Sequence, residues 1–263
     1  MGALTPPRVA IVGRGLIGRS IELGLLSRGG TVVAALDRGD DLSPLREADL
    51  IVLAAPVLEN IRLLPSIAPV LAPAAIVTDT GSTKAAIVRA ATGIRFVGGH
   101  PVTGGTGSGP STARQDLFQG QRWILTPGGD ADEEAVEAVR ALVESLGAIS
   151  VRLSPGEHDR IFAAISHLPQ LVISALMEQA GESAGSQGLG LAGPGLRDST
   201  RLAASPPGIW RDILATNHAE IAAALDRLIG DLTRMRDDAT GGELTRIFER
   251  AAFWKGELDE RSI

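Results

Sequence analysis

The stretch that decides the fold is "RVAIVGRGLIGRS", residues Arg8–Ser20. Its apolar start, Arg8–Val12, predicts a β-strand, and the spacing G-x-G-x-x-G follows at Gly13, Gly15 and Gly18. In this motif the first glycine allows a tight turn, the second lets a pyrophosphate approach the backbone, and the third lets a helix pack closely on the strand. The helix N-terminus supplies amide donors for phosphate. We therefore expect a dinucleotide-binding loop formed by Gly13, Gly15, Leu16, Ile17 and Gly18.

The choice of dinucleotide depends on the end of the next β-like run. Asp37 stands there, at about the distance from the glycines where such proteins carry an acidic residue. A carboxylate accepts hydrogen bonds from the ribose hydroxyls and repels a 2′-phosphate, which favours NAD. Arg38 follows directly and would suit the phosphate of NADP, so NADP remains the alternative. A purely structural glycine turn is the other interpretation of the loop.

Short runs rich in valine and isoleucine continue along the first half of the chain. They read "RVAIV", "TVVAAL", "LIVLAA", "AAIVTD", "IRFVGG", "RWILTP" and "AISVRL", with helix-like stretches between several of them. Continuous apolar strands separated by helices indicate a parallel sheet covered on both faces. With right-handed crossovers, this predicts an α/β, doubly wound, Rossmann-type domain over residues 1–153.

The pattern changes after Ser154, where strand-like runs stop. We expect an all-helical domain over residues 154–263, with helices at Pro155–Gln179, Pro207–Asp237 and Gly242–Glu257. The glycine-rich stretch Gly181–Gly195 is interpreted as a mobile linker between them.

The composition argues against several kinds of binding and catalysis. The 263 residues carry a formal net charge of −6 and no cysteine. An acidic chain is a poor candidate for non-specific nucleic-acid binding, and without cysteine there are no disulfides, Cys-ligated zinc or thiol catalysis. From the first residues we expect no secretory leader, and we expect no apolar run to approach the ~20 residues that cross a bilayer. We expect a cytoplasmic protein that binds no metal, nucleic acid or membrane.

Candidate catalytic groups follow three of the predicted strands. In doubly wound sheets, ligands bind beyond the carboxyl ends of the strands, where the segments Ala54–Val57, Asp79–Lys84 and Gly98–Gly105 should open. The first segment adds Ala55 and Pro56 to the predicted cofactor site. His100 suits general-base catalysis near neutral pH, and Ser82 would orient its ring. The alternative role of His100 is to satisfy a loop carbonyl.

The helical half adds two clusters. In "ISHLPQL", residues Ile165–Leu171, a proline interrupts a helical pattern just after His167; helix packing is the alternative role of that histidine. Asp198 and Arg201 lie three residues apart, on one face of a predicted helix. They form either a surface ion pair or a carboxylate that orients a guanidinium to grip a substrate carboxylate.

Together these motifs resemble a known family. "GRGLIG", "DTGSTK", "GGHPVTGG", "SHLP" and "RDSTRLAASPPGIWRDI", in this order and spacing, are similar to the prephenate/arogenate dehydrogenases of tyrosine biosynthesis. The resemblance runs from about Arg8 to Glu257. It implies a homodimer with intertwined helical domains, NAD(P) on the nucleotide-binding domain, and a small-molecule substrate at the domain interface.

The resemblance also implies a mechanism. His100 would accept a proton from the substrate hydroxyl as hydride leaves the same carbon for the nicotinamide, and loss of carbon dioxide would make the ring aromatic. Ser82 would orient His100. Arg201 would bind the ring carboxylate, with Asp198 and Trp210 shaping that pocket.

Two positions depart from the pattern of many prephenate-using members. Gln170 stands where they carry a histidine, and Thr106 stands at about the place of a glutamate. His167, Gln170 and Thr106 are nevertheless expected near the substrate. These changes leave three substrates open: prephenate, arogenate and 4-amino-4-deoxyprephenate, the amine analogue of antibiotic-type pathways. A non-catalytic NAD-binding redox sensor is the alternative of another class.

Overall fold

The computed structural model describes residues 7–103, 109–128, 131–238 and 240–260. By their contacts, the residues form two compact units, Met1–His218 and Ala219–Ile263. The first unit contains the sheet, its covering helices and the first helices of the C-terminal half. The domain boundary expected between residues 153 and 154 remains a prediction.

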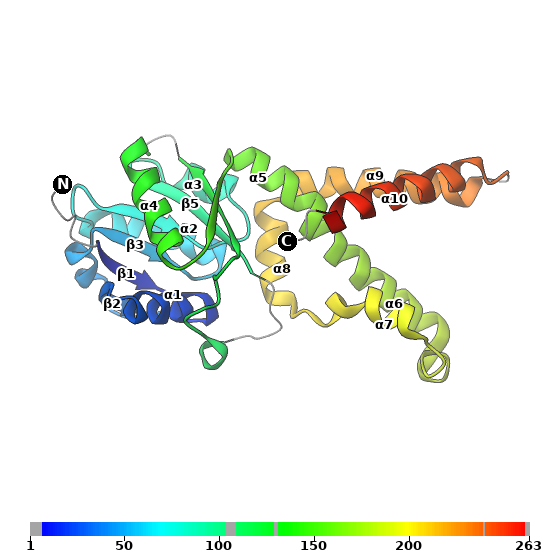
Figure 1. Ribbon diagram of the computed structural model, residues 1–263, viewed down its shortest axis with the longest axis horizontal. Coiled ribbons are helices and arrows are strands. Elements are labelled where there is room, and N and C mark those ends of the chain that lie inside the picture. Colours follow the sequence, from blue (N-terminus) through cyan, green and yellow to red (C-terminus); the bar gives the residue numbers. More distant parts are fainter. Residues whose placement is uncertain (1–6, 104–108, 129–130, 239, 261–263) are drawn as a thin grey trace. The chain divides into compact units, whose positions relative to one another are not determined.

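The first unit is built on a seven-stranded sheet (Figure 1) with the order β2-β1-β3-β4-β5-β6-β7. The strands are β1 Arg8–Val12, β2 Thr31–Leu36, β3 Leu50–Leu53, β4 Ile76–Asp79, β5 Phe96–Val102, β6 Arg122–Pro127 and β7 Ile149–Arg152. Each of the seven predicted runs forms one of them. All neighbouring pairs are parallel except β5 and β6, which are antiparallel. The predicted doubly wound sheet is thus confirmed, with one antiparallel step.

Strand β5 is longer than the sequence suggested. The expectation that the strand ends before His100 is wrong, because β5 continues to Val102 with His100 opposite Ile124 of β6. On its other side, β5 pairs with β4 only as far as Val97. Beyond that residue β5 has one neighbouring strand, a position in which Pro101 is tolerated without an N–H group.

Helices cover both faces of the sheet. Helices α1 (Leu16–Ser27) and α4 (Glu133–Ser145) pack on one face, where Ile21 and Val139 are fully buried in one apolar cluster. Helices α2 (Val57–Ile67) and α3 (Ala85–Ala90) contribute to the cluster on the other face. Short 3₁₀ turns complete this part at Ser43–Glu47, Ala68–Val70 and Pro110–Thr112. The core is mostly aliphatic, with Phe96, Phe118 and Trp123 buried among the aliphatic side chains.

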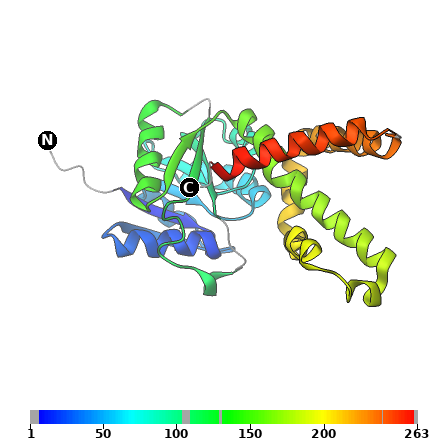
Figure 2. The ribbon, with the colours of Figure 1, turned by 45° about the vertical axis from the view of Figure 1, so that its right-hand side comes forward.

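The described residues of the C-terminal half after Ser154 form helices and connecting turns, with no strand. Its elements are α5 Pro155–Phe162, a π-helical turn η4 at Ala163–His167, α6 Leu168–Leu189, α7 Pro194–Ser199, a 3₁₀ turn η5 at Arg201–Ala204, α8 Pro207–Thr216, α9 His218–Asp237 and α10 Gly242–Glu260. A capping box between Ser154 and Glu157 starts α5. Helices α9 and α10 lie side by side in both views (Figures 1 and 2).

Two expectations about these helices need correction. The stretch Gly181–Gly195 is largely helical and not a continuous linker, because α6 resumes after a break at Gly185 and reaches Leu189, and α7 begins at Pro194. A glycine costs a helix about 1 kcal/mol relative to alanine, and at Gly185, with φ 60° and ψ −178°, the backbone leaves helical geometry and divides α6 into two segments. The predicted helix Pro207–Asp237 is interrupted at Asn217, whose φ of −130° is not helical.

The helix from Pro155 to Leu189 is also longer and more apolar than expected. It has 35 residues and a mean hydropathy of 1.4 over its most apolar window, 22% of which is buried. By length and composition it is able to cross a membrane, so the expectation that no run approaches this length is wrong. Apolar helices that pack against protein pass the same test, so the helix alone does not indicate a membrane protein.

Candidate functional site

A groove of three adjoining cavities follows the carboxyl ends of β1, β3, β4 and β5, all within the first unit. The first cavity, of about 340 Å³, is lined by the glycine loop and the end of β2. The second, of about 640 Å³, shares Gly15, Ala55 and Pro56 with the first. The third, of about 520 Å³, shares Leu16 and Ser82 with the second and contains His100. The cofactor loop and the predicted base therefore line one continuous groove.

The strand order explains where the groove opens. The chain leaves β1 toward β2 on one side and returns to β3 on the other side of β1. Neighbouring crossovers that run in opposite directions leave a crevice at the carboxyl ends of β1 and β3. Gly13 follows β1 and Ala54 follows β3, and both line the first cavity.

The three glycines of the loop have the geometry that a dinucleotide requires. Gly13 has φ 101°, and a Cβ there would lie 2.7 Å from the Ala54 carbonyl carbon. A Cβ on Gly18 would lie 1.9 Å from the Gly13 oxygen, so only glycine lets the helix approach the strand. A Cβ on Gly15 would meet nothing within 4 Å and would project into space that a ligand needs. The loop thus fits a bound pyrophosphate at the N-terminus of α1.

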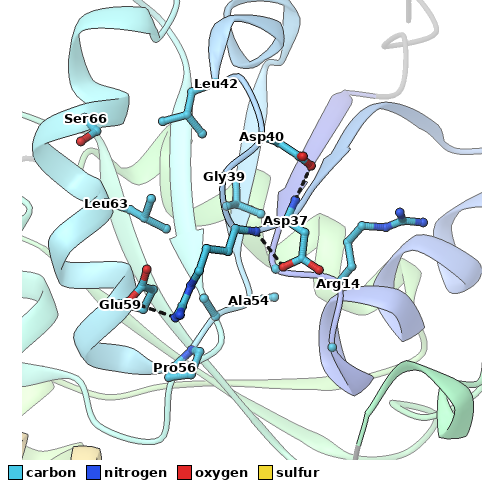
Figure 3. A pocket seen from close by; sticks show the side chains of 15 residues that line it. Arg14, Asp37, Gly39, Asp40, Leu42, Ala54, Pro56, Glu59, Leu63 and Ser66 are labelled. Atoms are coloured by element: carbon cyan, nitrogen blue, oxygen red, sulfur yellow. Dashed lines mark hydrogen bonds and ion pairs between the residues drawn. The ribbon is translucent and has the colours of Figure 1, made fainter.

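Charged side chains surround the far end of the first cavity. Figure 3 shows Asp37 and Glu59 on opposite sides of it. One oxygen of Asp37 accepts a hydrogen bond from the Arg38 backbone N–H at 2.9 Å. The Arg38 guanidinium lies 3.4 Å from the carboxylate of Glu59. Asp40 and Arg14 complete the charged lining.

At the other end, His100 belongs to a buried chain of hydrogen bonds. Its Nδ1 atom lies 2.8 Å from Nε2 of His158. Nδ1 of His158 in turn lies 2.8 Å from Oδ1 of Asp159. Phe162, one turn further along α5, stacks on the His158 ring at 4.4 Å between ring centroids. Helix α5 thus brings a histidine and a carboxylate behind the predicted base.

Asp159 also contacts the loop that carries Ser82. Its two carboxylate oxygens accept the backbone N–H groups of Lys84 at 2.7 Å and Ala85 at 2.9 Å. The Lys84 ammonium group is fully buried and donates to Asp79 at 2.6 Å and to the Gly99 carbonyl at 2.7 Å. A Cβ on Gly99 would lie 2.4 Å from the Asp79 carbonyl oxygen, so glycine is needed where β5 meets this loop.

Burial controls the protonation of these histidines. Removal from water lowers the pKa of His100 well below its usual value, and the neighbouring His158 and Lys84 lower it further. Burial likewise lowers the pKa of His158 and lowers that of His167 to about 4. Desolvation also lowers the pKa of Lys84, against the opposing effect of Asp79. All three imidazoles are therefore neutral at pH 7, and a neutral imidazole can accept a proton.

Ser82 lines the second and third cavities. The hydrogen-bond partner of Nδ1 of His100 is His158 and not Ser82. Sequence reasoning missed both His158 and Asp159. The available signal was a His-Asp pair in the first turns of a helix that begins directly after the last strand.

Of the predicted substrate residues, Trp210 lies in the groove. It lines the third cavity, and its indole Nε1 is buried with no hydrogen-bond partner among the described residues. His167 is buried beside it, with ring centroids 6.3 Å apart, and its Nδ1 lies 3.3 Å from the Asn217 amide nitrogen. The predicted interruption of the helix is the π-helical turn that ends at His167.

Gln170, Asp198 and Arg201 do not line any of the three cavities. Gln170 is buried and donates to the Leu202 carbonyl at 2.8 Å, while its carbonyl accepts from Ser205 at 3.1 Å, so it holds turn η5 against α6. Asp198 and Arg201 are exposed. Their expected shared helical face is wrong, because α7 ends at Ser199 and η5 starts at Arg201. Thr106 lies outside the described residues.

Comparison with known proteins identifies the family. A family model described as "Prephenate dehydrogenase, nucleotide-binding domain" matches residues 10–152. A second, "Prephenate dehydrogenase, dimerization domain", matches residues 154–249. This chain belongs to the prephenate dehydrogenase family. The predicted family is therefore confirmed.

Individual members of the family match nearly the whole chain. Prephenate dehydrogenase of Bacillus subtilis is 34% identical over 96% of this chain and 76% of its own length. Among solved structures, prephenate dehydrogenase from Aquifex aeolicus in complex with hydroxyphenyl propionate and NAD+ superposes with a TM-score of 0.87 at 26% identity, covering 97% of this chain and 99% of that one. Synechocystis arogenate dehydrogenase gives 0.80 at 31% identity, covering 96% and 99%.

These matches also support the predicted class of enzyme. The chain is an oxidoreductase of the prephenate and arogenate dehydrogenase type, whose reaction is an oxidative decarboxylation. Its fold is a nucleotide-binding domain with a mostly parallel sheet, followed by a helical dimerisation domain.

Proposed function

We propose that this prephenate dehydrogenase family member oxidises and decarboxylates a prephenate-type cyclohexadienol, with NAD as hydride acceptor and His100 as general base. The position of His100 carries the proposal. It lines the same cavity as Leu16 and Ile17 of the glycine loop and Trp210 of α8. A proton acceptor beside the cofactor loop is what a reaction that loses a proton and a hydride together requires.

The chemistry assigned to the protein is positioning and proton transfer. NAD, when bound, supplies the hydride acceptor. Neutral His100 accepts the proton of the substrate hydroxyl, and loss of carbon dioxide then leaves an aromatic ring. Because His158 holds the Nδ1 side of His100, Ser82 is assigned to the Nε2 side, where it orients the base and the arriving hydroxyl.

The walls of the groove suit an aromatic product with an anionic group. Ile209, Ile213 and Phe162 supply apolar surface to the third cavity. The unpartnered Trp210 N–H is a donor for a substrate oxygen. The assignment of Arg201 to the ring carboxylate, with Asp198 beside it, rests on the resemblance of the "RDSTR" segment to the family.

The charges of the first cavity favour NAD over NADP. Asp37 supplies the carboxylate expected for the ribose hydroxyls. Arg38, the residue suited to a 2′-phosphate, is drawn toward Glu59 instead. With Asp40, the acidic groups that line this cavity outnumber the arginines, which are Arg14 and Arg38. A 2′-phosphate therefore enters a negative environment.

Substrate, assembly and location complete the proposal. Prephenate, arogenate and 4-amino-4-deoxyprephenate share the ring carboxylate and the carbon that loses hydride, so they form one substrate class. Gln170 brings no charge to the place where related enzymes carry a histidine.

The match of residues 154–249 to a dimerization domain supports a homodimer formed through the helices. We place the enzyme in the cytoplasm.

A direct assay tests the proposal. The purified protein is mixed with NAD or NADP and each of the three substrates, and absorbance of the reduced nicotinamide and release of carbon dioxide are followed. We expect equal amounts of both products, with NAD preferred. NAD binding without turnover of any substrate would contradict the proposal and favour a redox sensor.

A further inference from the structure

The buried chain behind His100 points to a positioning role for two residues outside the groove lining. We propose that Asp159, acting through His158, fixes His100 in the tautomer that carries its proton on Nδ1. Nε2 of His100 is then left unprotonated toward the substrate. The inference rests on the proposed role of His100 as the base and extends it to residues that never touch the substrate.

The backbone donors to the Asp159 carboxylate decide which atom donates in each hydrogen bond of the chain from Asp159 to His100. Its Oδ1 accepts the Lys84 backbone N–H and its Oδ2 accepts that of Ala85. With a backbone donor on each oxygen, the carboxylate is held as an acceptor. His158 must therefore donate from Nδ1 in the 2.8 Å bond to Oδ1.

The tautomer of His100 then follows from the tautomer of His158. A neutral imidazole that donates from Nδ1 has a lone pair on Nε2. Nε2 of His158 thus accepts from Nδ1 of His100 across their 2.8 Å contact. His100 carries its proton on Nδ1, and its Nε2 is the free acceptor.

The surroundings of this buried chain disfavour other tautomers and ring orientations of the two histidines. His158 is fully buried and Asp159 is 2% exposed, so bulk water has little access to either. Stacking on Phe162 fixes the plane of the His158 ring. The Asn217 amide donates to the Asp159 backbone carbonyl at 2.8 Å and ties the same turn of α5 to the end of α8. The charged and titratable groups around the chain are Lys84, Asp79 and His167.

A spectroscopic experiment on the free enzyme tests the tautomer without any substrate. The chain has four histidines, so the ring ¹⁵N signals of histidine-labelled protein can be assigned by removing one histidine at a time. We expect a pyrrole-type Nδ1 and a pyridine-type Nε2 for His100. In Asp159→Ala the acceptor for Nδ1 of His158 is removed, so the tautomers are no longer fixed and the Nε2 signal of His100 should shift toward the pyrrole type. The exposed His218→Gln is the matched control and should leave His100 unchanged.

Kinetics separate positioning from a merely structural role. His158→Gln leaves the backbone hydrogen bonds of Asp159 in place but breaks the relay. We expect kcat to fall on the order of 100-fold in His158→Gln and in Asp159→Asn, with NAD affinity within about threefold of wild type. In Asp159→Asn the ascending limb of kcat/KM against pH should move to lower pH, because a negative charge that stabilises the imidazolium is lost.

These experiments distinguish a failure of the positioning inference from a failure of the proposed function. A pyrrole-type Nε2 on His100 in the wild-type enzyme would overturn the inference, whichever substrate the enzyme uses. So would folded His158→Gln with wild-type kcat and an unchanged His100 tautomer. If the tautomer is as expected but none of the three substrates turns over, the proposed function fails and the positioning of His100 stands.

Discussion

The two ends of the groove are held together in different ways. At the cofactor end, charged side chains meet across open space, and the Arg38 side chain is 79% exposed in its contact with Glu59. At the other end, Asp79 and Lys84 are fully buried and every charge has several partners. Solvent screens the first set of interactions and not the second.

This difference predicts how each end of the groove responds to amino-acid substitution. Exposed ion pairs contribute up to about 1 kcal/mol, so cofactor choice rests on small and adjustable energies. A buried charge that loses its partner costs about 3–5 kcal/mol. The proton-accepting end should therefore tolerate few substitutions, and the cofactor end should tolerate many with altered preference.

The largest expected effect on stability follows from Lys84→Met. The change leaves the Asp79 carboxylate buried without its ammonium partner, and we expect the free energy of unfolding to fall by about 3–5 kcal/mol. Denaturant unfolding measures it. The control is Lys255→Met, which removes an exposed i,i+4 partner of Asp259 and should change stability by less than about 1 kcal/mol. Equal decreases in the free energy of unfolding for the two substitutions would contradict the distinction between buried and exposed ion pairs.

The pH dependence of stability probes the buried end further. The unfolded chain takes up a proton on His167 near pH 6.5, while burial lowers the folded pKa to about 4. The unfolded state thus binds more protons in this window, and the free energy of unfolding falls as pH falls through it. The contribution of His167 amounts to about 3 kcal/mol. Denaturant unfolding at pH 7 and pH 4 should show a smaller decrease in His167→Gln than in the wild type, and an identical decrease would disprove the assignment.

The smallest expected effect lies at the cofactor end. Glu59→Gln releases Arg38, and we expect the ratio of kcat/KM for NADP to that for NAD to rise by about three- to fivefold, in keeping with an exposed pair of up to about 1 kcal/mol. Arg62→Gln is the control, since Arg62 contacts Glu59 at 3.4 Å without lining the cavity. An unchanged ratio in Glu59→Gln would mean that Arg38 does not face the 2′ position.

The same contrast explains what the sequence could predict. The glycine loop and the seven strands are local patterns of spacing and apolar runs, so they were predictable from the chain alone. His158 and Asp159 were not, because their role depends on how α5 packs against β5 and the start of α3. The stretch Gly181–Gly195 misled for a different reason: its glycine content lowers helix propensity, but the backbone leaves the helix only at Gly185 and between Leu189 and Pro194.

Arg201 marks the limit of sequence reasoning at the site. Its spacing from Asp198 suggested a shared helical face, but the backbone at Thr200, with φ −102° and ψ 10°, separates α7 from η5. A difference of one residue in a helix end decides whether two side chains face the same way. Its role toward the substrate remains a prediction.

The central claim is that His100 collects a proton beside the bound cofactor, and His100→Asn tests it most directly. Turnover of the best substrate and NAD affinity are measured in parallel in wild type and variant. We expect kcat to fall by about 10²–10⁴-fold, with the dissociation constant of NAD within about threefold of wild type. Turnover within about threefold of wild type in a folded, NAD-binding variant would contradict the account.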